Sequence, residues 1–92
     1  MQLLDYEFNF EFNLLKQNTN IVKLTDKELL LVALLFKNLG NIVSKEEISK
    51  YVYESNLPSD SSLRRLISRT RDKLPGLSIQ SESKQGYFLR EQ

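Results

Sequence analysis

Cysteine, histidine and tryptophan are all absent from this chain of 92 residues. Without cysteine the chain has no disulfide and no thiolate nucleophile, and without cysteine or histidine it lacks the usual zinc ligands. The absence of histidine also excludes His-based catalytic triads and the commonest general base. We therefore expect no metal site, no cofactor and no enzymatic activity.

Glycine and long apolar runs are scarce as well. The three glycines do not form a cluster that could cradle a phosphate. The longest apolar run, Leu29 to Phe36, has eight residues, far fewer than the ~20 needed to span a bilayer. No cationic and then apolar leader opens the sequence. These observations predict one cytoplasmic domain, residues 1–92, without membrane contact.

Charge is distributed unevenly although the formal net charge is only +1. Residues 1–63 carry six lysines and nine acidic residues, a balance of −3, whereas residues 64–92 carry seven basic and three acidic residues, a balance of +4. Five of those basic residues fall within 64–73, beside one acid. A basic segment on a slightly acidic body is typical of a nucleic-acid-binding face.

The N-terminal segment alternates apolar and polar residues, with Leu4, Tyr6, Phe8 and Phe10 on one side. A period of two predicts a half-buried strand. Together with the polar turn residues that follow, the pattern predicts two or three short antiparallel strands within about residues 3–24. We expect the aromatic stripe to pack in the core of this sheet.

A capping box opens the first expected helix, over about residues 25–39. Thr25 is suited to cap the first turn while Glu28, at the third helical position, bonds back to the cap. Gly40 suits a left-handed conformation just beyond the helix end.

A second capping box, Ser44 with Glu47, opens a helix over about residues 44–53. The apolar pair Ile42 and Val43 before it predicts a short bridging strand.

The third expected helix covers about residues 59–74, with Ser59 or Asp60 as its N-cap. Residues at steps of three and four form one apolar stripe: Leu63, Leu66, Ile67, Thr70 and Leu74. A separate exposed edge is polar and basic: Ser62, Arg65 and Arg69.

A hairpin ends the chain, over about residues 77–91, with a turn at 83–86. The order of elements predicts an α+β fold: a winged helix-turn-helix with an N-terminal antiparallel sheet, three helices and a C-terminal β-hairpin wing. In such a fold the third helix enters a major groove of DNA and the wing reaches the adjacent minor groove. A solvated charged helix in a mixed α+β domain is the alternative that periodicity alone leaves open.

The motifs resemble, over residues 24–90, the winged-helix effector domain of OmpR/PhoB-type response regulators. The matching segments are Leu24-Thr25-x-x-Glu28, Gly40-x-x-Val43-Ser44-x-Glu46-x-Ile48, Val52-Tyr53, Leu63-x-x-x-Ile67-x-Arg69-Thr70-Arg71-x-Lys73-Leu74 and Gly86-Tyr87-Phe88-Leu89. The resemblance implies a transcription regulator that binds double-stranded DNA, commonly as two protomers in tandem, and contacts RNA polymerase.

The resemblance also implies roles for individual residues. Arg69 matches the position that contacts base edges, and Arg65 faces the same groove. The other positions implied near the groove or the DNA backbone are Ser62, Leu66, Arg71, Ser44 and Lys45, the last two at a helix N-terminus. We expect Arg64 and Lys84 to add phosphate contacts. Glu54 and Leu57 match the loop that faces polymerase.

The sequence departs from the family pattern at the wing, where Ser83-Lys84-Gln85-Gly86-Tyr87 lacks the usual arginine and leaves Lys84 as its substitute. The chain also contains no receiver domain.

Two other classes of function remain open from the residues. A winged helix used for protein–protein contact without specific DNA binding is the main alternative, since the net charge is small. An enzyme would need Ser61 or Ser62 with Lys73, or the carboxylates Glu46 and Glu47, and these are explained more simply as a helix start and a capping box.

Overall fold

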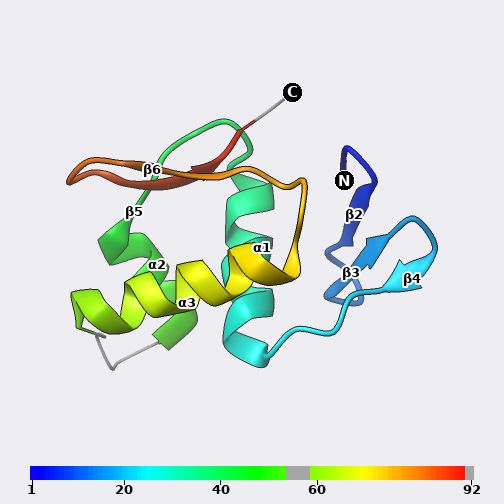
Figure 1. The fold of residues 1–92 in the computed structure, drawn as a ribbon, viewed down its shortest axis with the longest axis horizontal. Helices are drawn as coiled ribbons and strands as arrows, with labels where there is room; N and C mark the ends of the chain where they lie inside the picture. Colours follow the sequence, from blue (N-terminus) through cyan, green and yellow to red (C-terminus); the bar gives the residue numbers. More distant parts are fainter. Residues whose placement is uncertain (54–58, 91–92) are drawn as a thin grey trace.

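A computed structural model describes residues 1–53 and 59–90, which form an N-terminal four-stranded sheet, three helices and a second, three-stranded sheet (Figure 1). The helices and the C-terminal hairpin make up one end of the elongated molecule, and the N-terminal sheet makes up the other. The predicted fold class, a winged helix-turn-helix preceded by an antiparallel sheet, is confirmed.

The N-terminal sheet is a meander with every neighbouring pair antiparallel. Its strands are β1 (Gln2–Leu3), β2 (Tyr6–Asn9), β3 (Leu14–Gln17) and β4 (Asn20–Ile21). The expectation of two or three strands was wrong, because three tight turns divide the segment. Each turn holds a residue with positive φ: Leu4 at 57°, Asn13 at 54° and Asn18 at 58°. Asparagine tolerates this left-handed region, whereas leucine rarely adopts it, so the turn at Leu4 has no sequence signal.

The expected aromatic core stripe holds for only two of its three residues, and the apolar Leu4 before it is also exposed. Tyr6 and Phe8 are fully buried, but Phe10 is 41% exposed and Leu4 is 50% exposed. Phe10 lies beyond the last residue of β2, and Leu4 lies in the turn before it. The period of two therefore applies only within the strand itself, and Leu3 takes the core position that Leu4 was expected to fill.

Helix α1 (Asp26–Lys37) is the central element of the fold. Its capping box is complete, since the Glu28 amide donates to Thr25 Oγ1 at 3.2 Å and the Thr25 amide donates to Glu28 Oε1 at 2.8 Å. Every residue from 31 to 36 is buried, because helices α2 (Lys45–Tyr53) and α3 (Asp60–Lys73), strand β7 (Gly86–Leu89) and the N-terminal sheet all pack on this helix. The helix ends at Lys37 rather than at residue 39, and Gly40 follows with φ of 81° as expected for a left-handed turn.

Helices α2 (Lys45–Tyr53) and α3 (Asp60–Lys73) begin with capping serines. The Glu47 amide donates to Ser44 Oγ at 3.1 Å, which is one half of the expected second capping box. Ser59 is the N-cap of α3 and accepts from the Ser62 amide. The expected apolar stripe of α3 is confirmed, with each member at most 3% exposed: Leu63, Leu66, Ile67, Thr70 and Leu74.

The second sheet joins the C-terminal hairpin to the start of α2. Strands β6 (Ile79–Glu82) and β7 (Gly86–Leu89) form the hairpin, and β5 (Val43–Ser44) pairs with β7 to give the order β5-β7-β6. The bridging strand predicted near residue 43 is therefore present. It pairs with Gly86 and Tyr87, the residues of β7 next to the hairpin turn, and so attaches the wing to the residues just before α2. The described helices are each too short or too polar to traverse a bilayer.

Candidate nucleic-acid interface

Helix α3 has a buried face and a basic face. While its apolar stripe packs on the core, Arg64, Arg65 and Arg69 are exposed. Within residues 1–53 and 59–90 the one ion pair is formed by Glu28 and Lys73, so none of these three guanidinium groups is bound to a carboxylate of the described chain. Unpaired exposed arginines on one helix suit phosphates and base edges, which guanidinium groups bind through two parallel hydrogen bonds.

The other expected contact residues gather at the same end of the molecule. Ser44 and Lys45 lie half-buried where β5 meets α2, and Lys84 is exposed in the hairpin turn with φ of 62°. Ser62 is exposed in the first turn of α3, where its Oγ lies 3.1 Å from Ser59 Oγ. In Figure 1 the hairpin tip and the starts of α2 and α3 all lie at the end of the long axis away from the N-terminal sheet. These positions and α3 can therefore face one elongated ligand together.

Three residues of the basic segment differ from the sequence interpretation. Leu66 is 0% exposed and belongs to the core, so its expected place near the groove was wrong. Lys73 is bound to Glu28, and the Arg71 Nε donates to the Ile79 carbonyl at 3.0 Å. The basic surface of α3 is therefore smaller than the count of five cations predicts, although Arg71 keeps donors for a second partner because a guanidinium has five N–H groups.

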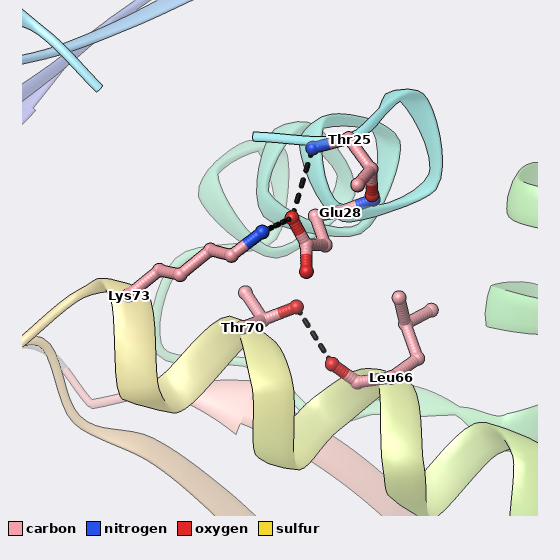
Figure 2. Close-up of polar contacts among 5 residues, drawn as sticks. All are labelled: Thr25, Glu28, Leu66, Thr70 and Lys73. Atoms are coloured by element: carbon pink, nitrogen blue, oxygen red, sulfur yellow. Dashed lines mark hydrogen bonds and ion pairs between the residues drawn. The ribbon is translucent and has the colours of Figure 1, made fainter. Parts of the chain in front are cut away.

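Glu28 connects α1 to the end of α3 (Figure 2). Its Oε1 accepts from Lys73 Nζ at 2.7 Å and from the Thr25 amide at 2.8 Å. The Glu28 side chain is 1% exposed and that of Lys73 is 42% exposed. Burial raises the pKa of the Glu28 carboxyl, but the hydrogen bonds from Lys73 and Thr25 outweigh burial and hold the pKa below its ordinary value. Glu28 is thus a buried carboxylate whose charge is balanced by a cation of the basic helix.

Tyr6 connects the N-terminal sheet to the same end of α3. Its hydroxyl donates to the Pro75 carbonyl at 2.8 Å, and the side chain is fully buried. Burial raises the pKa of the Tyr6 hydroxyl, and the charge of Asp5 raises it further. The hydroxyl therefore stays protonated, as a donor, at neutral pH.

These connections were missed by the sequence interpretation, although one signal was available. Glu28 precedes Leu31, Val32 and Leu35 by three, four and seven residues, so it lies on the apolar face of α1. A carboxylate at such a position is buried and needs a cationic partner. Nothing in the sequence specifies that this partner is Lys73.

Glu54 and Leu57, the residues expected to face polymerase, lie outside the residues that the structure describes. Their predicted role stays a prediction.

The arrangement defines a winged-helix domain. Helices α2 and α3 pack on α1, α3 carries the basic face, and a hairpin follows α3 directly as the wing.

Comparisons with known proteins give the family. The family model described as "Transcriptional regulatory protein, C terminal" matches residues 17–89. The chain is 43% identical over 68 residues to the transcriptional regulatory protein CpxR homolog of Haemophilus influenzae, a match that covers 73% of this chain and 30% of that protein. The chain therefore belongs to the family of C-terminal domains of transcriptional regulatory proteins, the OmpR/PhoB-type effector domains, as the motifs predicted.

Solved structures agree with this assignment. The DNA-binding domain of CpxR from E. coli superposes with a TM-score of 0.88 at 27% identity, covering 99% of this chain and 95% of that one. The DNA-binding domain of Bacillus subtilis CssR superposes with a TM-score of 0.77 at 28% identity, covering 91% and 98%. The chain thus spans nearly all of these isolated domains but under a third of its full-length relative.

Proposed function

We propose that this chain is the sequence-specific DNA-binding domain of a bacterial transcription regulator, with α3 in the major groove and the hairpin wing toward the minor groove. The observation that carries the proposal is the exposed edge of Arg65 and Arg69, opposite the buried stripe of α3. Related domains at 27% and 28% identity are described as DNA-binding domains, which supports the same role.

The contacts divide into two kinds by chemistry. Arg69 and Arg65 are proposed to contact base edges, because two parallel N–H groups match the acceptors of guanine. The remaining residues are proposed to contact phosphates: Ser62, Arg64, Arg71, Ser44, Lys45 and Lys84. Phosphate contacts fix orientation and carry no sequence information.

Selection of duplexes from a random pool, followed by anisotropy titrations at several salt concentrations, tests the proposal. Four of the six proposed phosphate contacts are cations, Arg64, Arg71, Lys45 and Lys84. Neutralising about four phosphates predicts a slope of log K against log salt of roughly −4. A single-base change in the selected site should weaken binding by about 1–3 kcal/mol. A flat salt response with no sequence preference would instead identify a winged helix that binds a protein.

A charge-matched control separates the α3 face from general attraction. Arg69→Ala and Lys23→Ala each remove one exposed cation, but Lys23 lies between β4 and α1, away from the proposed interface. We expect the first substitution to weaken binding to the selected duplex and the second to leave it unchanged within error.

The wider context of the domain is also proposed from the family. We propose that residues 1–92 act as one non-catalytic unit in the cytoplasm, where the DNA is, and that two protomers bind direct repeats in tandem. Contact with RNA polymerase through the loop that contains Glu54 and Leu57 belongs to the same proposal.

A further inference from the structure

Three polar bonds converge on residues 71–75, at the C-terminal end of α3. The Arg71 Nε donates to the Ile79 carbonyl of β6, Lys73 Nζ binds Glu28 Oε1 of α1, and the Pro75 carbonyl accepts from the Tyr6 hydroxyl of β2. We call these three bonds the clamp. They tie one end of the helix to the wing, to the central helix and to the N-terminal sheet.

The rest of α3 is held differently. Among residues 1–53 and 59–90, the side-chain hydrogen bonds of residues 59–70 are local: Ser59 with Ser62, and Thr70 Oγ1 with the Leu66 carbonyl at 2.7 Å (Figure 2). The apolar stripe attaches this part to the core, and apolar contact is non-directional. The orientation of α3 is therefore set most narrowly at the clamp.

The clamp contributes less to folding stability than apolar residues in the same place could, so stability alone does not explain it. Glu28 Oε2 is buried and has no hydrogen-bond partner in the described structure, and a buried polar atom without a partner is destabilising. Replacing a buried ion pair by apolar residues is often neutral or stabilising. An apolar pair could not replace the directional hydrogen bonds. Glu28 Oε1 accepts from both the start of α1 and the last turn of α3, and so fixes how the two helices lie relative to each other.

We propose that Glu28, Lys73 and Tyr6 are positioning residues, and that the clamp sets the angle of α3 relative to the wing and the N-terminal sheet. This inference rests on the proposed function, because the consequence of that angle is discrimination between DNA sequences. Bidentate contacts from Arg65 and Arg69 require the helix to lie at one angle in the groove, whereas phosphate contacts tolerate small rotations.

Two substitutions break the clamp with little other change. Glu28→Gln retains the capping box, since glutamine also serves at this position, but removes the charge that binds Lys73. Tyr6→Phe removes only the hydroxyl that binds Pro75. Lys73→Arg retains a cation and tests rescue. Val52→Ala is the control, because Val52 is 4% exposed in α2 and takes no part in the clamp, so it lowers stability alone.

Two measurements decide the inference. The first is the ratio of dissociation constants for a scrambled and a selected duplex. We expect this ratio to fall at least about fivefold in Glu28→Gln and Tyr6→Phe, and to stay unchanged in Lys73→Arg. It should also stay unchanged in Val52→Ala, even though that control loses as much melting temperature as the clamp variants or more. The second is the set of N–H residual dipolar couplings, which should fit the wild-type structure outside α3 but not within it in the two clamp variants.

The outcomes are distinct. A ratio that follows melting temperature in all variants, or α3 couplings that still fit the wild-type orientation, would overturn the positioning role. A wild-type protein without any sequence preference would overturn the proposed function and the role in discrimination, while the couplings would still decide whether the clamp sets the angle of α3.

Discussion

Lys73 Nζ lies 2.7 Å from Glu28 Oε1, so a cation of the basic helix is paired with a buried carboxylate of α1. The two partners are unequal, because Glu28 is 1% exposed and Lys73 is 42% exposed. Removing the cation leaves a buried charge without a partner, whereas removing the charge of Glu28 releases a lysine that can reach water. The two single substitutions should therefore differ in their effect on stability.

We expect Lys73→Met to lower the free energy of unfolding by about 2–4 kcal/mol, somewhat less than the loss of a fully buried partner. Glu28→Gln should lower it by about 1 kcal/mol. The double variant should be more stable than Lys73→Met alone. Urea unfolding of the three variants measures these differences, and equal losses in the two single variants would show that the carboxylate gains water when Lys73 is removed.

Acid should weaken the same contact. The pKa of Glu28 is lowered in the folded state, so in the window between its folded and unfolded pKa values only the unfolded chain binds the proton. Its contribution to stability is present above the unfolded pKa, near 4.3, and is lost as pH falls through the folded pKa. Unfolding free energies between pH 3 and 7, roughly the range of carboxyl titration, should fall less toward acid in Glu28→Gln than in the wild type.

The glycines of the C-terminal region form a matched pair for a test of close packing. A Cβ at Gly86 would lie 2.0 Å from the Val43 carbonyl oxygen, on the neighbouring strand β5, whereas a Cβ at Gly76 would meet nothing within 4 Å. Gly76 has φ of 88°, so alanine there meets only backbone strain, about 1–2 kcal/mol. Gly86→Ala should lose at least about 3 kcal/mol, since overpacking adds to strain. Equal melting temperatures would mean that β5 and β7 separate easily.

Local signals predicted much of this fold. Thr25, Ser44 and Ser59 cap the helices as their positions indicated, and the stripe of α3 is buried as its spacing indicated. These features depend on residues within one or two helical turns, so a pattern in the sequence contains them. The order of elements then left few folds that could bury the apolar faces.

The features that the sequence did not predict depend on distant partners. Tyr6 and Pro75 are separated by 69 residues and Glu28 and Lys73 by 45, and no spacing rule links them. The turn at Leu4 arises from pairing of β1 with β2 against the preference of leucine. The sequence predicted that residues 64–73 form a basic region of α3. It did not predict that Lys73 binds Glu28 and that Arg71 donates to the Ile79 carbonyl, which is seen only in the folded chain.

Arg69 is expected to contact a base. If it binds guanine through two hydrogen bonds, Arg69→Ala should weaken binding to the selected duplex by about 1–3 kcal/mol and relax the preference at one base pair. Arg69→Lys should recover little of that preference, because an ammonium group cannot form the planar pair of bonds. Titrations of all four bases at the affected position check this. Equal loss on every sequence would make Arg69 a phosphate contact.

Substitutions of Lys84 separate two properties of the wing: the positive charge of its side chain and the left-handed backbone conformation of its turn. Its φ of 62° is left-handed and its side chain is exposed in the hairpin turn. Lys84→Ala keeps the strain and removes the charge, so the melting temperature should hardly change. Lys84→Gly removes both, and relief of strain, partly offset by the greater entropy of the unfolded chain, should raise stability by about 0.5–1 kcal/mol.

Both Lys84 variants should lose the same affinity for DNA if the side chain contacts a phosphate. The slope of log K against log salt should then become shallower by about one in each, while Lys84→Arg should retain the wild-type slope. The matched control is Lys23→Ala, which removes a cation far from the wing. An unchanged slope and affinity in Lys84→Ala and Lys84→Gly would mean that the wing of this chain does not reach the DNA, and that α3 and the start of α2 bind it alone.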